Sequence, residues 1–423
     1  MNTAFQKIKM MFADRSLRGR VFFTLFALAI FRVLAAIPTP GIDTFQLQNL
    51  LSSNQLLSLF NVFSGGGLSQ LSIVMLGVGP YITASIIMQL LTILSPRLKA
   101  LYQEEGEAGR KRFSQYSRLL TVPLALVQGF SFLILLQRQG VLPELGIWSM
   151  LINLAVIIAG SVLLMWIGEL VTEFGIGNGL SLIIFAGIIA SVPSTIGQFI
   201  FTYDPSQIPL YIAFVIAAVL VILGVVIVTE AERPIPVTYA KRVRGMKVYG
   251  GTSTYLPLRV NQAGVIPIIF ALSLLLFPQM IFSALSNVSN AAIASVAGVG
   301  LSLFNNPWFY AAIYFLLVFA FTYFYTAVTF DPHTLSTNLQ KNGAFIPGVR
   351  PGQPTAEYIS TVLTRITLVG AIFLGLIAVL PLILRAVTGL TYLAIGGTAL
   401  LIVVSVVLDI TKKVNAQLSM REY

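Results

Sequence analysis

The sequence of 423 residues contains no cysteine and a single histidine, His333. The absence of cysteine excludes disulfides, thiolate metal ligands and thiol nucleophiles, and one histidine cannot build a histidine-cluster metal site. Charged residues are also scarce, at 10% of the chain, whereas soluble domains carry roughly 25%. A water-soluble fold could not cover its surface with so few charges, so we expect most of this chain to lie in lipid.

Acidic residues are missing from the interior of the apolar blocks, because Glu169, Glu230, Asp331 and Asp409 lie at block edges. Ion- and proton-coupled transporters usually need buried carboxylates, so their absence counts against that class. The glycine-rich stretch at 175–179 lacks the lysine and the following helix of a phosphate loop, and a flexible hinge fits it better. We therefore expect no catalytic residue, no metal, no cofactor and no enzyme activity, and any energy source has to come from a partner.

Apolar sequence is what the chain has in abundance: 57% of its residues are hydrophobic and the mean hydropathy is +0.88. These residues come in blocks of about 17 to 25, a length that crosses roughly 30 Å of hydrocarbon. Backbone groups in lipid must pair within each segment, so we expect helices and not strands. The sequence predicts ten spans, at residues 21–37, 68–94, 119–136, 150–167, 180–192, 210–228, 265–285, 309–330, 366–384 and 392–410. The fifth is short and borrows residues 177–179.

The formal net charge of +11 is distributed asymmetrically along the chain. Of the 26 Lys and Arg residues, all but Arg32, Arg138 and Arg385 lie in the N-terminal segment, in the loops after the second, sixth and eighth spans, or in the tail. This pattern places both termini and these loops in the cytoplasm, and it explains the charge without a nucleic-acid partner. The N-terminus does not resemble a cleavable signal peptide, because no small-residue cleavage site follows its first apolar block.

Three cytoplasmic segments are long. The first covers residues 95–118. In the second, residues 230–261, strand-forming stretches at 237–239 and 247–249 lie near Gly250 and Gly251, which predicts a basic hairpin. The third, residues 331–358, is dense in proline and glycine, which predicts an ordered, non-helical tip.

The second apolar block contains a helix break. Gly77, Gly79 and Pro80 interrupt it, and Ser and Gln residues that suit lipid poorly precede the break. One interpretation is a short half-helix inside a pore, because broken helices are tolerated at membrane depth where protein or water surrounds them. The other is a kinked but ordinary helix.

Arg32 lies inside the first apolar block. A charge at the bilayer centre costs at least about 2.5 kcal/mol on insertion scales. The side chain therefore either faces an internal cavity, or reaches an interface or a backbone carbonyl in a purely structural role, which we favour.

The basic cytoplasmic loops are candidate docking surfaces. Arg242 and Arg244 flank a turn at Gly245, and Arg350 lies between prolines and glycines at 347–352. Acidic protein surfaces or an RNA backbone would be attracted to them. For the cluster at 241–247, a role in topology and lipid head-group contact competes with docking. For Arg350 we prefer docking, because one charge in a rigid loop adds little to topology.

A series of motifs in this order resembles the SecY family of preprotein translocase subunits, which is homologous to the alpha subunit of the eukaryotic translocon. The motifs are IPTPGID at 37–43, FSGG at 63–66, PYITASII at 80–87, EGEAGR at 105–110, GIGNG at 175–179, LPLRVN at 256–261, AGVIP at 263–267, FIPGVRPG at 345–352 and GGT at 396–398. The resemblance runs nearly end to end.

The resemblance implies an all-α membrane protein with ten transmembrane helices, in two pseudo-symmetric halves (residues 1–194 and 195–423) around an hourglass pore. It implies a plug half-helix at about 65–73 that includes Gly65, Gly66, Gly67, Leu68, Ser69, Gln70, Leu71 and Ser72. An aliphatic pore ring would comprise Val78, Ile82, Ile184, Ile269 and Ile402, and the second and third spans would form a lateral gate against the seventh and eighth. A narrow apolar ring of this kind dewets and blocks ions.

The partners that the resemblance implies are SecE-like and SecG-like small membrane subunits, the SecA motor ATPase, the ribosome, signal peptides, unfolded secretory chains and membrane lipids. Arg242, Arg244 and Arg350 would meet SecA or the ribosome, and the location would be the bacterial cytoplasmic membrane. The chain departs from the family at Phe174 and Pro234, where basic residues are common, and it has little sequence beyond its last span.

Two other functions remain open from the residues themselves. A small-molecule secondary transporter would also place a discontinuous helix at its site. An intramembrane enzyme has little support, because the chain lacks cysteine, a histidine dyad and buried carboxylates.

Overall fold

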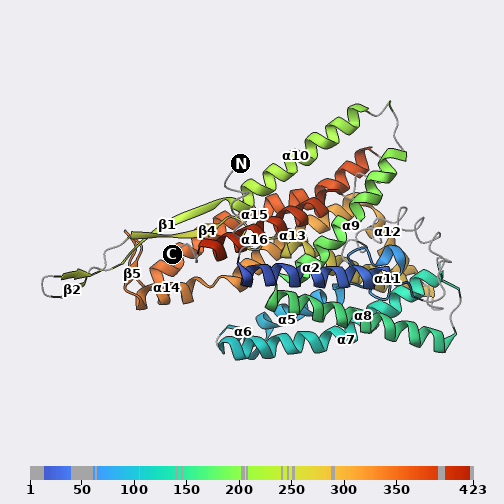
Figure 1. Cartoon of the computed structure of the whole chain (residues 1–423), viewed down its shortest axis with the longest axis horizontal. Helices are drawn as coiled ribbons and strands as arrows, with labels where there is room; N and C mark the ends of the chain where they lie inside the picture. The colour runs from blue at the N-terminus through green and yellow to red at the C-terminus, as the bar shows by residue number, and fades with distance from the viewer. Residues whose placement is uncertain are drawn as a thin grey trace.

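The computed structural model is a bundle of long helices from which a β-ribbon projects at one end (Figure 1). It describes residues 14–39, 61, 64–103, 105–138, 142–143, 146–201, 205, 208–239, 242–244, 247–249, 253–286, 291–388 and 396–419. The helices are α2 (Arg15–Ala36), η1 (Leu68–Gln70), α5 (Gly79–Leu94), α6 (Pro96–Gln103), α7 (Gly106–Arg138), α8 (Ile147–Phe174), α9 (Gly179–Phe201), α10 (Ile208–Glu230), α11 (Ile266–Leu285), α12 (Ala291–Asn305), α13 (Pro307–Thr329), α14 (Pro332–Lys341), α15 (Gln353–Thr388) and α16 (Gly396–Ser419). The strands are β1 (Glu232–Tyr239), β2 (Arg242–Arg244), β3 (Lys247–Tyr249), β4 (Ser253–Arg259) and β5 (Ala344–Phe345).

Each predicted span overlaps with a described helix, although the second, at 68–94, is helical as α5 only from Gly79 onward, and the all-α membrane class is confirmed. Within the described residues, six helices are long and apolar enough to cross a membrane, and α5 with α6 forms a further broken pair bent by 117°. The apolar parts of α9 and α11 are shorter, at Gly179–Pro193 and Ile266–Leu275. The full count of ten spans agrees with this arrangement and stays a prediction.

Local sequence explains where several helices begin. The side chain of Asn306 accepts hydrogen bonds from the backbone N–H groups of Trp308 and Phe309, and Pro307 occupies the first turn of α13. Asn178 does the same for Leu180 and Ser181 at the start of α9. These are ordinary N-caps. Helix α9 begins at Gly179, so a helix does follow residues 175–179, as the predicted fifth span requires.

The helices pack in two groups along the chain. The first group joins α5 to α7, α7 to α8, α8 to α9, and α2 to both α8 and α9. The second joins α10 to α16, α11 to α13, α13 to α15, and α15 to α16. Between the groups, α11 packs on α5 and α7, and α16 packs on α9. We call these contacts the α11 seam and the α16 seam.

The projecting ribbon confirms the predicted hairpin. Strand β1 pairs antiparallel with β4, and β2 pairs with β3 at the tip. Strand β1 also pairs with β5 through Thr238 and Tyr239. Pro234 and Pro236 precede this stretch, where β1 has β4 as its one neighbour in the sheet, so their missing N–H groups need not break a ladder.

The predicted non-helical tip at 331–358 was wrong, because α14 and the start of α15 lie within it. Asp331 caps α14, Pro332 occupies its first turn, and Gly343 follows it with a φ of 67°. These turn-forming residues are the stop and start signals of a helix. The residues between α14 and α15 form the tip, with Gly348 and Gly352 at positive φ.

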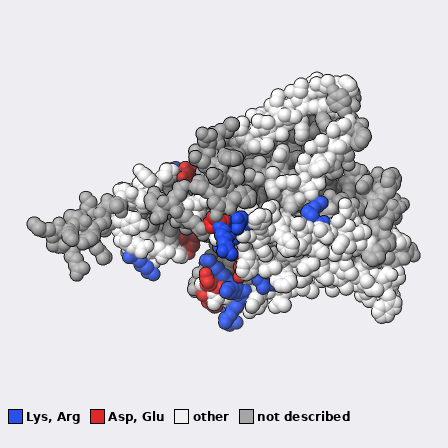
Figure 2. Space-filling model, viewed as in Figure 1, with Lys and Arg blue, Asp and Glu red and all other residues white. Residues whose placement is uncertain are grey.

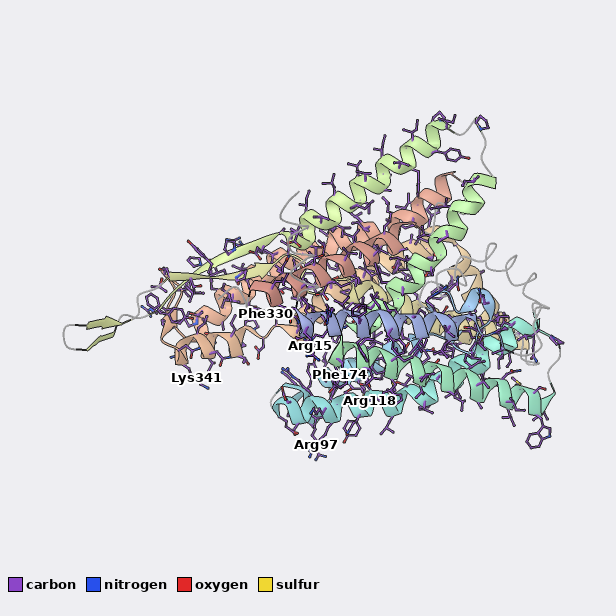
Figure 3. All side chains as sticks on the ribbon, in the orientation of Figure 1. Arg15, Arg97, Arg118, Phe174, Phe330 and Lys341 are labelled. Carbon is purple, nitrogen blue, oxygen red and sulfur yellow. The ribbon has the colours of Figure 1, made fainter. Side chains whose placement is uncertain are left out.

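Charged residues gather at one end of the bundle. Figure 2 shows them over α6, α14 and the start of α2, whereas the opposite half of this face is almost entirely uncharged. Figure 3 labels Arg15, Arg97, Arg118, Phe174, Phe330 and Lys341 at this same end. Ion pairs join neighbouring helices, from Arg118 of α7 to Glu169 of α8 at 2.8 Å and from Lys412 of α16 to Glu230 of α10 at 2.9 Å. The loops that the sequence predicted to share the cytoplasm thus share one end of the molecule.

Candidate functional site

The five predicted ring residues are all buried. Val78 precedes α5, Ile82 lies on α5, Ile184 on α9, Ile269 on α11 and Ile402 on α16. Their exposed fractions are between 0% and 6%, and all five belong to one hydrophobic cluster. The structure therefore excludes a lipid-facing position for each of them.

The ring residues come from the elements that form the two seams. Val78 and Ile82 with Ile269 represent the α11 seam, and Ile184 with Ile402 represents the α16 seam. Both helix groups thus contribute aliphatic side chains to one apolar centre. A path through this centre would be closed by flexible aliphatic groups that water wets poorly.

The predicted lateral gate corresponds to α5 and α7 on one side and α11 and α13 on the other. Helix α11 makes the main contact across this boundary, and α13 packs behind it. Phe270 fastens α11 to α13 by edge-to-face contacts with Phe321 and Tyr325, at ring-centroid distances of 5.9 and 6.2 Å. On the opposite side, Gln128 of α7 donates a long hydrogen bond of 3.5 Å to Thr83 of α5.

The predicted plug segment does not form a half-helix. Between Ser64 and Val78, the chain makes the single 3-10 turn η1 followed by irregular turns. Gly65 and Gly66 have φ angles of 68° and 83°, and Leu71 lies in the left-handed region at 43°. Backbone conformations of this kind cannot continue a right-handed helix. Neither the half-helix nor the kinked-helix interpretation describes this stretch.

Hydrogen bonds attach the middle of the plug segment to the residues after α2. Thr39 donates to the Leu71 carbonyl through both its N–H, at 2.9 Å, and its hydroxyl, at 2.6 Å. The Ile73 N–H donates to the Ile37 carbonyl at 3.0 Å, so Pro38 and Ser72 lie opposite each other in an antiparallel bridge. The apolar side chains of the segment enter a second cluster with α7 and α8; these are Leu68, Leu71, Met75 and Leu76.

The backbone of the plug segment approaches the backbones of α8 and α9 closely. A side chain on Gly187 of α9 would overlap with Gly65, and a side chain on Gly160 of α8 would overlap with the Ile73 carbonyl. Neither glycine was singled out from the sequence, because a glycine within an apolar block gives no sign of what passes next to it.

Arg32 has a carbonyl partner, as the favoured interpretation required. Its Nη1 donates to the Gly65 carbonyl at 3.1 Å, and its guanidinium carbon lies 5.9 Å from the centre of the Phe31 ring. The side chain is thus turned toward the plug segment.

Glu169 of α8 joins three helices, which the sequence did not predict. It accepts from Arg118 of α7 at 2.8 Å and from the Tyr81 hydroxyl of α5 at 3.4 Å. The carboxylate is largely covered, with 18% of its side chain exposed. Its place near the end of an apolar block suggested an interfacial acid and nothing more.

The candidate docking residues lie beyond the charged end of the bundle. Arg350 is exposed on the tip between α14 and α15. Its carbonyl accepts from the Thr355 hydroxyl at 2.8 Å, and the Ser336 hydroxyl donates to Gly352 at 2.6 Å, so the tip is firmly held. Arg242 and Arg244 lie on β2; their side chains, like that of Ser69 in the plug segment, lie outside what the structure describes.

The ribbon and the Arg350 tip belong to one body. A cluster of buried apolar side chains joins β1, β4, β5 and α15, namely Ile235, Val237, Leu258, Ala344, Ile346, Ile359 and Val362. Val349, which precedes Arg350, packs on the same cluster. Phe174, one of the departures from the family pattern, is exposed and packs edge-to-face on Phe23 at 6.1 Å.

Known proteins resemble this chain in sequence and in fold. The family model for SecY matches residues 72–411. The protein translocase subunit SecY of Mycobacterium tuberculosis is 45% identical over 96% of both chains. A solved SecY structure, whose plug domain is described as stabilising the closed translocation channel and maintaining a membrane seal, matches with a TM-score of 0.65 at 19% identity, over 96% of this chain and 93% of that one. Canine Sec61 in a ribosome–channel complex from the endoplasmic reticulum matches with a TM-score of 0.61 at 18% identity and the same coverage. The family model and the sequence identity over nearly the whole length show that the chain belongs to the SecY family.

Proposed function

We propose that this chain is the protein-conducting channel subunit of a Sec translocase, which passes unfolded secretory chains across the membrane and releases membrane segments sideways into the bilayer. The observation that carries this proposal is the burial of five aliphatic side chains, which belong to elements of both groups, in one apolar cluster. The translocase relatives of similar length support it.

The ring and the plug segment together account for a closed but openable path. Aliphatic side chains hold no water when the path is narrow, so ions are blocked. Their rotamers can adjust around a passing chain, because they carry no fixed hydrogen bonds. The plug segment lies against α8, α9 and the end of α2, which supports its role as a second seal.

Sideways release requires one seam to open. We infer that the α11 seam is the lateral gate and that the α16 seam is the hinge between an N-terminal half (residues 1–194) and a C-terminal half (195–423). The packing of helices within each group supports this division. Separation at the α11 seam would expose the ring directly to lipid and to an apolar signal peptide.

The charged end of the bundle would face the cytoplasm, with both termini, in the cytoplasmic membrane of a bacterium. Arg242, Arg244 and Arg350 extend from that end and would bind SecA or the ribosome. Canine Sec61, which has the same fold, was solved in a complex with a ribosome. Only 6% of the most apolar stretch of helix α10 is buried inside the molecule. This leaves a large apolar surface available to SecE-like and SecG-like subunits and to lipids.

This function needs no chemistry from the chain itself. A conduit lowers the barrier to crossing, and the free energy for directed movement comes from a motor ATPase or from chain synthesis. Family membership supports the channel over a small-molecule secondary transporter.

Photo-cross-linking of a stalled secretory chain tests the proposal. A photoreactive amino acid at Val78 or Ile82 should form adducts with the stalled chain. The same probe at Leu223 of α10, which is 51% exposed, is the matched control and should form none. Adducts at the control position alone would contradict the proposal.

Purification in mild detergent tests the proposed partners. A small companion of one to three spans should co-purify with the chain, and added SecA or ribosomes should bind. Loss of binding on Arg350→Glu would support the docking role of the tip, whereas unchanged binding would contradict it.

A further inference from the structure

Arg32 is a charge near the outer end of α2, four residues before the helix ends at Ala36. It lies about 18 Å along the helix axis from Arg20, at a rise of 1.5 Å per residue, and therefore away from the charged end. A charge in this position needs a partner, because the bilayer offers none. Within the part of the chain that the structure describes, its hydrogen-bond partner is a backbone carbonyl.

That carbonyl belongs to Gly65, the first residue of the plug segment. The hydrogen bond from Nη1 measures 3.1 Å. The ring of Phe31, which is fully buried, lies directly against Gly65. Consecutive residues of α2 thus contact the same glycine, one through its ring and the other through its charge.

The opposite side of Gly65 faces α9. Gly187 approaches so closely that a side chain on it would overlap with the Gly65 backbone, whereas a side chain on Gly65 would overlap with the Phe31 ring. Gly65 and Gly66 both have positive φ, which suits glycine alone at no cost. The turn therefore packs tightly between α2 and α9, and a side chain on Gly66 would lie close to both the Arg32 guanidinium and the Gly187 carbonyl.

The remainder of the plug segment is attached differently. The bridge between Pro38 and Ser72 and the apolar cluster of Leu68 and Leu71 hold its later residues. The Arg32 bond acts at the start, upstream of both. Releasing it would loosen the start of the segment, so the bridge and the apolar cluster would carry more of the attachment.

We propose that Arg32 is a positioning residue that seats the start of the plug segment against Gly187, and that breaking its bond to the Gly65 carbonyl is a step in opening the channel. The inference rests on the proposed channel function. A charged donor bonded to a carbonyl is strong where water is scarce. Once water enters the path, water molecules can replace the Gly65 carbonyl as acceptors for the guanidinium, so the attachment weakens as the channel opens.

Ion flux through the resting channel tests this role. The full chain, co-expressed with its small membrane companions, is reconstituted into vesicles that contain a halide-sensitive dye. Arg32→Met, which keeps the length but removes the donors, should raise the resting halide leak roughly ten-fold, as expected for the loss of one hydrogen bond from a charged group. Arg32→Lys should give a smaller rise, because its ammonium lacks the planar fork. Arg18→Met on the same helix is the matched control and should leak like the unmodified chain.

An engineered disulfide can show whether the leak comes from a loosened plug segment or from a general defect in the protein. Pro38 and Ser72 are a non-hydrogen-bonded pair in the bridge, whose Cα atoms lie about 4.5 Å apart in such pairs, within disulfide range. The chain has no other cysteine. In the Arg32→Met background, Pro38→Cys with Ser72→Cys should restore the seal when oxidised and leak again when reduced. Pro38→Cys alone, which lies outside the plug segment, should leak equally under oxidising and reducing conditions.

The outcomes distinguish this inference from the proposed function. If deletion of residues 65–72 raises the leak but Arg32→Met and Arg32→Lys do not, Arg32 has no positioning role and the channel proposal stands. If the deletion also leaves the leak unchanged, the plug role itself fails. A leak in Arg32→Met that the oxidised disulfide does not close would overturn the inference, because the leak would then arise elsewhere.

Discussion

Asp331 lies in the short connection between α13 and α14. Its Oδ1 accepts from the His333 N–H at 2.9 Å and its Oδ2 from the Thr334 hydroxyl at 2.7 Å. Desolvation raises the pKa of this carboxyl, but the hydrogen bonds from Thr334 and His333 outweigh it and lower the pKa below its usual 3.8. One side chain therefore fixes where α14 starts, and with it the direction in which the chain leaves the membrane helix.

Replacement of this cap should loosen α14 in a predictable way. Asp331→Ala should destabilise the helix by about 1 kcal/mol, whereas Asp331→Asn, which caps equally well, should cost little. Faster amide hydrogen exchange at residues 333–336 in the alanine variant alone would report this. Equal exchange in both variants would contradict the capping role.

The lowered pKa gives the same site a pH dependence. Because the folded-state pKa lies below the unfolded value, the charged carboxylate contributes its full stabilisation above pH 3.8 and loses it as the pH falls through the lowered folded value. Protection of residues 333–336, corrected for intrinsic exchange rates, should therefore fall in the unmodified chain as the pH drops below 3.8. In Asp331→Asn it should stay constant over this range.

The elements differ in how much of their structure can be read from sequence. The long apolar helices α7, α8, α10 and α13 were predictable, because apolar length alone requires a span. Helix α14 was not predictable. The prolines and glycines at its start and after its end resemble those of a loop until their positions relative to the helix are known. Helix α12 is short and rich in alanine and glycine, so it fell below the length of a span and was absent from the prediction.

The plug segment is the element whose removal is most informative. Deleting residues 65–72 should raise the ion leak through the resting channel, because the ring of Val78, Ile82, Ile184, Ile269 and Ile402 would then be the remaining seal. The control replaces Ser295 and Ser302 of α12 by alanine, because both hydroxyls bond within their own helix and the leak should not change. A length-matched deletion at the start of α15 is unsuitable as a control, since it would alter the tip. Unchanged conductance in the deletion would argue against a plug.

The whole molecule is polarised, with its charges at one end and its apolar surface elsewhere (Figure 2). Moving lysine and arginine side chains from the cytoplasm across the membrane is costly. The charged end should therefore stay in the cytoplasm. This orientation concerns the entire bundle, because Arg118 with Glu169 and Lys412 with Glu230 fix helices of both groups at that end.

Single cysteines can test this orientation, because the chain has none of its own. Asn342→Cys follows α14 at the charged end, and Ser149→Cys lies at the start of α8, far from its charged end; both positions are exposed. A membrane-impermeant maleimide should label Asn342→Cys in inverted vesicles and Ser149→Cys in right-side-out vesicles. The reverse pattern would overturn the proposed orientation.

The sequence by itself determined the membrane class, the approximate position of most spans and the common side of the basic loops, because these depend on the transfer of whole segments between water and lipid. Only the tertiary structure decided that Gly65, Gly187 and Arg32 meet, that Glu169 joins three helices, and that the plug segment is irregular. The physical reason is that these features depend on close approach between helices distant in the chain, which the hydropathy of a segment does not record. The ring residues stand between the two cases: their apolar character is local, but their shared burial at the seams required both groups of helices to be in place.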